Sequence, residues 1–304
     1  WPVPSLTVRI ASMPAAPRPR AAASPAMIFE APIAATMTAP ISAAVAAAMG
    51  QWSTYAYQGG YVTDGALEGG VAVLGSDGDQ EGVTLLSSAG SFRMVTTSTL
   101  ALNGKMWFEA RIARSTIATA TGEFFVGLMT PSLSSNLPRA AMPISTTDDT
   151  LSTTPSFFGF HCDSTTAVRG GPTEVAVAFE LASGTVNYPT NGTTLLASTS
   201  QTVLAANAFV KLGFIFDPMG PTKRITSATA RQTAGQVKRQ LVRFFVNGVE
   251  LPMFLTSDDV QNATATQAFP TGFMAPVVAH MNTTGSSPAT TLIDSIAVAQ
   301  MALT

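Results

Sequence analysis

The sequence predicts an all-β fold of the β-sandwich or jelly-roll class, and two observations lead to this prediction. From residue 51 onward, short segments with strand-like patterns alternate with turns rich in Gly, Pro and Asn, and amphipathic helical periodicity is almost absent. In addition, LVRFFVNGVELP at 241–252 has the signature of a β-hairpin, because Asn-Gly tolerates the positive φ angles of a two-residue type I′ turn.

The two-residue turn determines which residues of this hairpin share a face. Alternate positions form an apolar face that we expect to be buried: Val242, Phe244, Val246, Val249 and Leu251. On the opposite face, Arg243 and Glu250 lie diagonally across the two strands, within reach of an ion pair. Pro252 has no backbone N–H and is expected to end the ladder of hydrogen bonds.

Further segments have the patterns expected of strands. Apolar and polar residues alternate in 105–114, 174–182 and 210–217, so each should have one face in the core. The segments 123–129 and 157–162 are apolar on both faces, as central strands of a packed sandwich should be. The remaining predicted strands are 82–88, 91–97, 273–281 and 291–301.

The composition changes near residue 50. Residues 1–50 are mainly Ala, Pro, Ser and Met, and a proline every few residues opposes both helix and sheet. We expect an extended, irregular arm that becomes ordered by packing on other subunits, with a disordered tail as the alternative. Residues 51–304 are expected to form the sandwich domain.

Charge and cysteine content exclude several classes of function. Charged residues make up 11% of the chain, against about 25% in ordinary soluble domains. The net charge of −2 favours neither nucleic acid nor a membrane surface. A single cysteine excludes a disulfide framework and a multi-cysteine zinc site. No apolar run reaches the roughly 18 residues of a membrane span. We therefore expect no cofactor and no membrane partner.

The order of GKMWFEARIARS, EFFVGLMT, FVKLGFIFDP, RFFVNGVELP and TLIDSIAVAQ resembles the concanavalin A-like jelly roll. That superfamily includes legume lectins, laminin-G domains and laminarinase-type glucanases. More narrowly, the chain resembles jelly-roll proteins among the virion structural proteins of tailed bacteriophages. The resemblance covers about residues 65–301 and rests on strand order and local sequence, without a catalytic signature.

The residues that catalysis would need are missing or badly placed. Glucanases of this fold carry a Glu-x-Asp-x-x-Glu strand, and no such spacing occurs here. Glu109 is a lone carboxylate beside Arg111, where we expect a surface ion pair. His161 and Cys162 are neighbours on a predicted strand and point to opposite faces. Cys162 is expected to be a buried structural thiol, and a dyad with His280 is the alternative. We expect no catalytic residue and no enzyme activity.

An acidic segment at 75–82 raises the question of a metal site. Asp77, Asp79 and Glu81 stand at alternate positions, and their oxygens could ligate calcium. The segment departs from the EF-hand loop, so we expect an acidic surface loop and no metal.

Opposite charges gather in two separate stretches of the chain. No acid occurs between Asp217 and Glu250, and no base occurs between Trp52 and Phe92. The expected partner-binding residues lie in the arm and in the basic stretch: Arg9, Arg18, Arg20, Lys223, Arg224, Arg231, Lys238 and Arg239. A solvated charge distribution is the alternative. Nucleic-acid binding is not expected, because no aromatic residues interleave with the basic cluster.

These observations lead to a non-enzymatic virion structural protein. The expected role is a capsid decoration or cement protein at the capsid surface, which binds the major capsid protein or other virion subunits through its arm and loops. We expect a homo-oligomer or a lattice-bound protein. The alternative is a carbohydrate-binding module of a phage fibre or adhesin. Its candidate sugar-stacking aromatics are Trp52, Tyr55, Tyr57, Tyr61 and Trp107.

Overall fold

The computed structural model describes the sandwich strands and the turns that join many of them. The described residues are 27–30, 46–49, 52–57, 59–65, 71–78, 81–87, 92–96, 100–118, 122–131, 143–144, 151, 155–163, 173–181, 203–225, 235–261, 269–282 and 289–301, with side chains described from residue 52 onward except at 64 and 65.

One sheet has eight strands. In spatial order it contains β15 (Val249–Leu255), β14 (Val242–Val246), β11 (Val210–Phe216), β7 (Met106–Arg114), β17 (Thr291–Gln300), β5 (Val71–Ser76) and β4 (Gly60–Gly65), and β1 (Met27–Glu30) pairs with β17. Neighbouring strands are antiparallel. Many neighbours are far apart in sequence, so long connections cross between the sheets.

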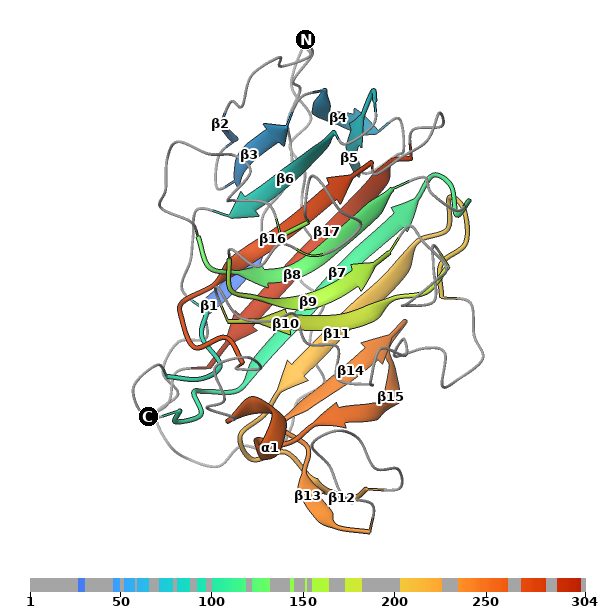
Figure 1. Ribbon diagram of the computed structural model, residues 1–304. Coiled ribbons are helices and arrows are strands. Elements are labelled where there is room, and N and C mark those ends of the chain that lie inside the picture. The colour runs from blue at the N-terminus through green and yellow to red at the C-terminus, as the bar shows by residue number, and fades with distance from the viewer. Residues whose placement is uncertain are drawn as a thin grey trace.

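The second sheet has seven antiparallel strands and packs against the first (Figure 1). In spatial order it contains β10 (Ala176–Glu180), β9 (Phe157–Cys162), β8 (Glu123–Met129), β16 (Ala275–Met281), β6 (Gly82–Ser87), β3 (Trp52–Tyr57) and β2 (Ala46–Met49). The chain is therefore an all-β jelly-roll sandwich of two antiparallel sheets, as predicted. A separate hairpin of β12 (Thr222–Arg224) and β13 (Val237–Arg239) lies at one end.

The core lies between the two sheets and follows the predicted alternation. On β7 and β11, the residues predicted to face inward are buried: Met106, Phe108, Ala110, Ile112, Leu212, Phe214 and Phe216. Phe108 and Phe214 stack with ring centroids 4.9 Å apart within one sheet. Phe158 of the other sheet meets Phe214 edge-on at 4.7 Å, so aromatic packing joins the two layers.

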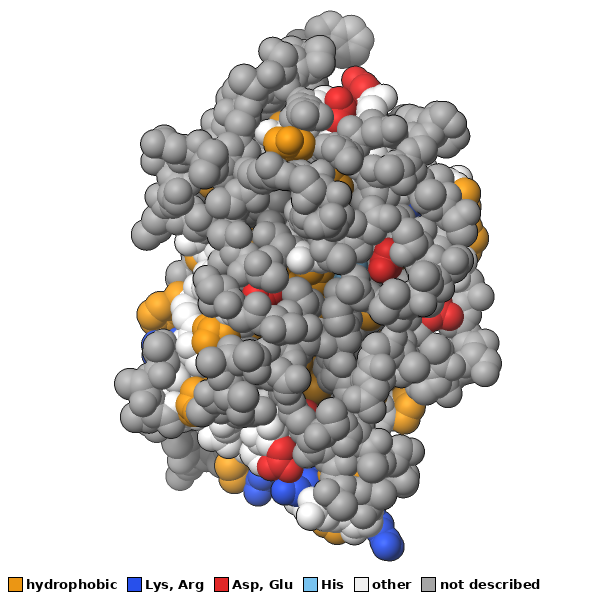
Figure 2. Space-filling view, viewed as in Figure 1, with side chains coloured by type: hydrophobic (Ala, Val, Ile, Leu, Met, Phe, Trp, Pro, Cys, Tyr) orange, Lys and Arg blue, Asp and Glu red, His pale blue; other side chains and the backbone are white. Residues whose placement is uncertain are grey.

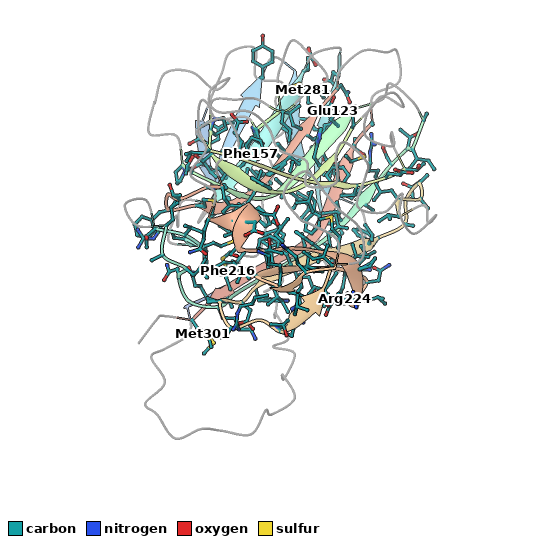
Figure 3. The ribbon with its side chains drawn as sticks, turned by 60° about the horizontal axis from the view of Figure 1, so that its bottom comes forward. Glu123, Phe157, Phe216, Arg224, Met281 and Met301 are labelled. Carbon is teal, nitrogen blue, oxygen red and sulfur yellow. The ribbon has the colours of Figure 1, made fainter. Side chains whose placement is uncertain are left out.

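The outer face of the seven-stranded sheet is also apolar and buried. It carries Leu86, Phe125, Met129, Phe157, Ala178, Ala275, Val277, Ala279 and Met281. Ile144 and Leu151 form a β-bridge with each other and pack on this face. Glu123, Phe157 and Met281, labelled in Figure 3, come from three neighbouring strands of this sheet. The predicted burial of both faces of β8 and β9 is confirmed.

The hairpin β14–β15 confirms the predicted turn and corrects its outer end. Asn247 and Gly248 have φ angles of 50° and 81°, as a type I′ turn requires. Pro252 does not end the ladder: between the pairs Phe245–Glu250 and Arg243–Phe254, β14 advances by two residues and β15 by four. Residues in a bulge are left out of the ladder, so the missing backbone N–H of Pro252 costs no hydrogen bond there. The two extra residues of this bulge preserve the alternation of faces, since only an odd shift would exchange them.

The buried face of the hairpin is largely as predicted. Val242, Phe244 and Leu251 are buried. Val249, directly after the Asn247-Gly248 turn, is 68% exposed, so this part of the predicted buried face is wrong. The predicted ion pair of Arg243 and Glu250 is present at 3.0 Å.

Two further expectations need comment. Within the predicted strand 91–97, the described residues 92–96 do not form a strand: Phe92 and Val95 make only isolated bridges to Met274 and Leu102. Two pieces of the predicted arm, β1 and β2, pair with β17 and β3 of the same chain. The rest of the arm lies outside the described residues, and the domain boundary near residue 50 stays a prediction.

Helix is almost absent from the described residues. The short α1 (Ser257–Val260) follows β15, and the Thr256 side chain caps it by accepting from the backbone N–H of Asp258. The described part of the chain has no helix with the length and hydropathy of a membrane span.

Candidate functional site

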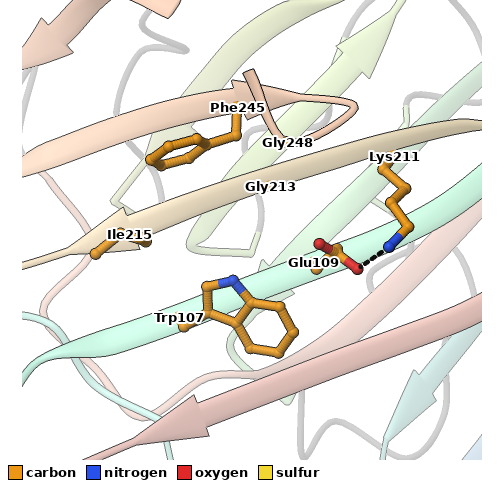
Figure 4. Close-up of a pocket in the computed structure, with 7 residues that line it drawn as sticks. All are labelled: Trp107, Glu109, Lys211, Gly213, Ile215, Phe245 and Gly248. Carbon is orange, nitrogen blue, oxygen red and sulfur yellow. Dashed lines mark ion pairs between the residues drawn. The ribbon is translucent and has the colours of Figure 1, made fainter. Parts of the chain in front are cut away.

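An open depression lies on the outer face of the eight-stranded sheet (Figure 4). Its volume is about 230 Å³, and it is lined by Trp107, Glu109, Lys211, Gly213, Ile215, Phe245 and Gly248. These residues come from β7, β11 and the hairpin β14–β15, which are adjacent strands. We call this feature the Gly213 depression.

Strand register explains why the surface is hollow at this point. Gly213 is an outward-facing position of β11, directly opposite Glu109 on one neighbouring strand and Phe245 on the other. Because glycine has no side chain, the row from Glu109 to Phe245 has a gap in its middle. A Cβ atom at Gly213 would lie 3.0 Å from the carbonyl oxygen of Phe108 and would occupy this gap.

Two aromatic rings stand beside the gap. Trp107 lies opposite Ile215 in the next row of the sheet and is 37% exposed, a large open area for a tryptophan. Figure 4 shows the rings of Trp107 and Phe245 on either side of β11. The depression therefore has aromatic walls and a floor formed by backbone.

The charges around the depression are paired. Glu109 Oε1 lies 3.0 Å from Lys211 Nζ, and both side chains are partly exposed. The predicted partner of Glu109 was Arg111, but Arg111 instead pairs with Asp294 at 2.8 Å. Lys211 can reach Glu109 because it lies diagonally across from it, two residues along β11 from Gly213, the residue opposite Glu109. Exposed ion pairs contribute little to stability, so Glu109 and Lys211 remain available to bind polar groups.

Glu109 is the single carboxylate that lines the depression. Glycoside hydrolysis uses two carboxyl groups on either side of the scissile bond. The lining residues alone therefore do not assemble that pair. They do provide flat apolar rings, a hydrogen-bond acceptor and a hydrogen-bond donor, which are groups that bind polar rings without reacting with them.

The other four aromatic residues predicted to stack on a sugar lie in different parts of the sandwich. Trp52 is 2% exposed and lies in the core, so it serves packing rather than stacking. Tyr55 and Tyr57 pack against the apolar outer face of the seven-stranded sheet. Tyr61 belongs to β4 of the other sheet, where burial raises the pKa of its hydroxyl and the nearby Asp77 adds to this effect. Of the five candidates, only Trp107 lines the depression.

A buried polar cluster at one end of the sandwich was not predicted. Arg114 is fully buried, and its Nη2 donates to the carbonyl oxygen of Gly122 at 2.7 Å. Its Nη1 donates to Sγ of Cys162 at 3.3 Å. The sequence did carry a signal for this cluster, because Arg114 shares the core face of its strand with Met106 and Ile112.

The two histidines occupy separate surroundings. His161 lies 3.0 Å from Glu123 on the outer side of the sheet, whereas Cys162 faces the core, as predicted. His280 Nε2 donates to Asn282 Oδ1 at 3.2 Å, and its Nδ1 lies 3.0 Å from the hydroxyl of Thr291. Both ring nitrogens of His280 are thus used in contacts other than the proposed dyad.

Burial sets the ionisation of this cluster. Burial raises the pKa of the Cys162 thiol to about 11, although Arg114 opposes the shift. Burial, with a further contribution from Arg114, lowers the pKa of His280 to about 3. A protonated thiol and a neutral imidazole are structural groups rather than a nucleophile and its base.

The acidic segment does not form a metal site in its described part. Asp77 is exposed, and Glu81 accepts from the backbone N–H of Gly78 at 2.7 Å. Asp79 lies outside the described residues. Among the side chains that the structure places, no three His, Cys, Asp or Glu residues gather as metal ligands.

Four of the eight basic residues predicted to bind a partner lie together on the end hairpin. Lys223, Arg224, Lys238 and Arg239 lie on β12 and β13. Arg9, Arg18, Arg20 and Arg231 lie outside the described residues.

Comparison with known proteins gives likeness of fold only. No known protein family and no curated protein matches this chain. The winged bean acidic lectin complexed with methyl-α-D-galactose is 10% identical, with a TM-score of 0.48, over 92% of this chain and 100% of the lectin. Peanut lectin with a bound 9mer peptide is 13% identical, with a TM-score of 0.46, over 92% and 100%.

A third solved structure comes from a virus. The carbohydrate esterase vb_24B_21 of the Shiga toxin-encoding bacteriophage phi24B is 17% identical, with a TM-score of 0.37, over 83% of this chain and 90% of the esterase. At such low scores, these likenesses assign no ligand and no activity to this chain.

Proposed function

We propose that this chain is a non-enzymatic carbohydrate-binding module that holds a sugar ring in the Gly213 depression. The observation that carries the proposal is the exposed ring of Trp107 beside a floor without a side chain. Exposing this much of a tryptophan ring is unfavourable in water. A pyranose ring has an apolar C–H face that would cover it.

The lining residues suit the two faces of a sugar. Trp107 and Phe245 offer apolar area to the C–H groups, and Gly213 lets the ring approach the backbone closely. Glu109 can accept hydrogen bonds from ring hydroxyls and Lys211 can donate to them. The bound sugar would thus replace water at an ion pair that is already partly exposed.

A glycan array tests the proposal. Wild-type protein is expected to bind a defined group of oligosaccharides, and Trp107→Ala should lose this binding while its melting temperature stays nearly the same. Phe273→Ala is the matched control, because Phe273 is an aromatic side chain that is 54% exposed outside the depression. Absence of glycan binding by the wild type, or equal losses in the two variants, would refute the proposal.

The location of such a module is a separate proposal. The resemblance to phage jelly-roll proteins supports a virion protein at the capsid surface or on a fibre, in contact with the major capsid protein or other subunits. Its test is detection of the chain in purified particles and mapping of its position by antibody labelling. Absence from the particles would exclude this location and leave the sugar site untouched.

A further inference from the structure

One row of the sheet leads from the edge of the Gly213 depression toward the basic hairpin. In this row Trp107 pairs with Ile215, Ile215 with Arg243, and Arg243 with Phe254. Three steps between adjacent strands, each about 4.8 Å, span roughly 15 Å. At the end of the row, Nζ of Lys223 lies 5.6 Å from the ring centroid of Phe254. The hairpin therefore begins where the row ends.

One face of the hairpin is anchored to the sandwich. Lys223 and Lys238 are directly opposite each other and share this face. Nζ of Lys238 lies 2.9 Å from Asp258 of α1, and Lys223 covers Phe254. These contacts place β12 and β13 beside β15.

The other face of the hairpin carries two exposed guanidinium groups. Arg224 lies opposite Val237, and Arg239 lies opposite Thr222. Arg239 Nη1 donates to the carbonyl oxygen of Gly220 at 3.1 Å, which orients this side chain. Figure 2 shows Lys and Arg side chains gathered at the end of the molecule where Figure 1 places β12 and β13.

These guanidinium groups lack acidic partners within the described part of the chain. No described carboxylate forms an ion pair with Arg224 or Arg239. The sequence adds no acid nearby, because none occurs between Asp217 and Glu250. A guanidinium group binds planar oxyanions through two parallel hydrogen bonds, so carboxylate or sulfate groups fit this face.

We infer that the glycan bound by this chain is acidic, and that Arg224 and Arg239 bind its carboxylate or sulfate groups while another sugar of the same polymer occupies the Gly213 depression. This inference rests on the proposed function. Single-stranded nucleic acid fits less well, because its binding sites stack bases on exposed aromatic rings. The described residues of β12 and β13 include no aromatic ring.

Calorimetric titration of the full chain with paired polymers tests the inference. Oligogalacturonate and its methyl ester share one sugar backbone and differ in whether each carboxyl group is charged or methylated, and dextran sulfate and dextran provide the sulfate comparison. The wild type is expected to bind at least one acidic polymer about tenfold or more tighter than its neutral counterpart. The double variant Arg224→Ala/Arg239→Ala should lose this difference and keep the binding of the neutral polymer. Arg93→Ala is the control, because its guanidinium stacks on Phe273 and neither residue belongs to the hairpin strands.

The variants separate failure of the inference from failure of the proposed function. If acidic and neutral polymers bind equally while Trp107→Ala weakens both, the inference is overturned and the sugar site stands. If the double variant abolishes binding and Trp107→Ala has no effect, the proposed site is wrong and the inference falls with it. Equal affinity for an oligothymidylate of similar charge would show binding of any polyanion and would also overturn the inference.

Discussion

The guanidinium of Arg114 on β7 donates a hydrogen bond across the sandwich to the thiol of Cys162 on β9, with 3.3 Å between Nη1 and Sγ. This contact joins the two sheets through polar groups, within the buried polar cluster that also holds His280. Buried polar groups are tolerated when they are hydrogen-bonded, and Arg114 also donates to the Gly122 carbonyl oxygen. The cluster is thus part of the packing and is separate from the Gly213 depression.

Cys162 is expected to be unreactive in the folded protein. Its thiol is buried and has a pKa of about 11, so both access and thiolate content are low. A chromogenic disulfide reagent at about pH 8 should label it only after denaturant is added. Rapid labelling of the native chain would mean that this end of the sandwich opens readily.

His280 should make the fold sensitive to acid. Its pKa is about 3 when folded and about 6.5 when unfolded, so the unfolded chain binds more protons between these values. The stability that the neutral His280 contributes is complete above pH 6.5. Between pH 6.5 and about pH 3, the equilibrium constant for unfolding rises about tenfold for each pH unit of acidification. Urea unfolding of the wild type and of His280→Gln across this range checks the difference. Parallel curves for the two proteins would contradict it.

The two adjacent phenylalanines of β14 should respond differently to truncation. Phe244 is fully buried, so Phe244→Ala is expected to cost about 3–5 kcal/mol of unfolding free energy. Phe245 lines the depression on the opposite face, so Phe245→Ala should cost about 1 kcal/mol and weaken sugar binding. Chemical denaturation measures both changes. Equal losses of stability would show that both faces of the hairpin are buried.

Alternation along single strands was readable from the sequence, and contacts between distant strands were not. The pattern of 105–114 predicted the faces of β7 correctly from Met106 to Ile112, and the same alternation, though not applied to Arg114, places that residue inward. The glycine at position 213 was visible on the outer face of its segment. Its importance depends on Glu109 and Phe245 lying opposite it, and that register joins segments more than 30 residues from it in sequence.

The aromatic cluster and the proline show the same limit in another form. Trp52 and Tyr61 were grouped because they are close in sequence, but the chain passes from one sheet to the other between β3, which carries Trp52, and β4, which carries Tyr61. Trp52 therefore reaches the core, while Tyr61 lies on an edge strand. The prediction that Pro252 ends the strand assumed a regular ladder of hydrogen bonds. A bulge in β15 accommodates the proline instead, and local sequence propensity does not reveal such a bulge.

Glu109 should contribute to binding and not to turnover. Glu109→Gln removes the ion pair with Lys211, and we expect a change of at most about 1 kcal/mol in stability, because both groups are partly exposed. Affinity for the sugar should fall roughly tenfold, since a charged acceptor is lost. Reducing-sugar assays on β-glucans should give no hydrolysis with either protein. Hydrolysis that disappears in Glu109→Gln would make the site catalytic.

Fluorine NMR of the full chain labelled with 5-fluorotryptophan tests sugar binding at Trp107 most directly. The chain has three tryptophans, so Trp107→Phe and Trp1→Phe assign two resonances, and the third, from the buried Trp52, is an internal control in the same spectrum. Titration with an oligosaccharide selected on the array should shift the Trp107 resonance in a saturable manner and leave that of Trp52 unchanged. If calorimetry shows that the same oligosaccharide binds while the Trp107 resonance does not move, the sugar does not occupy the Gly213 depression.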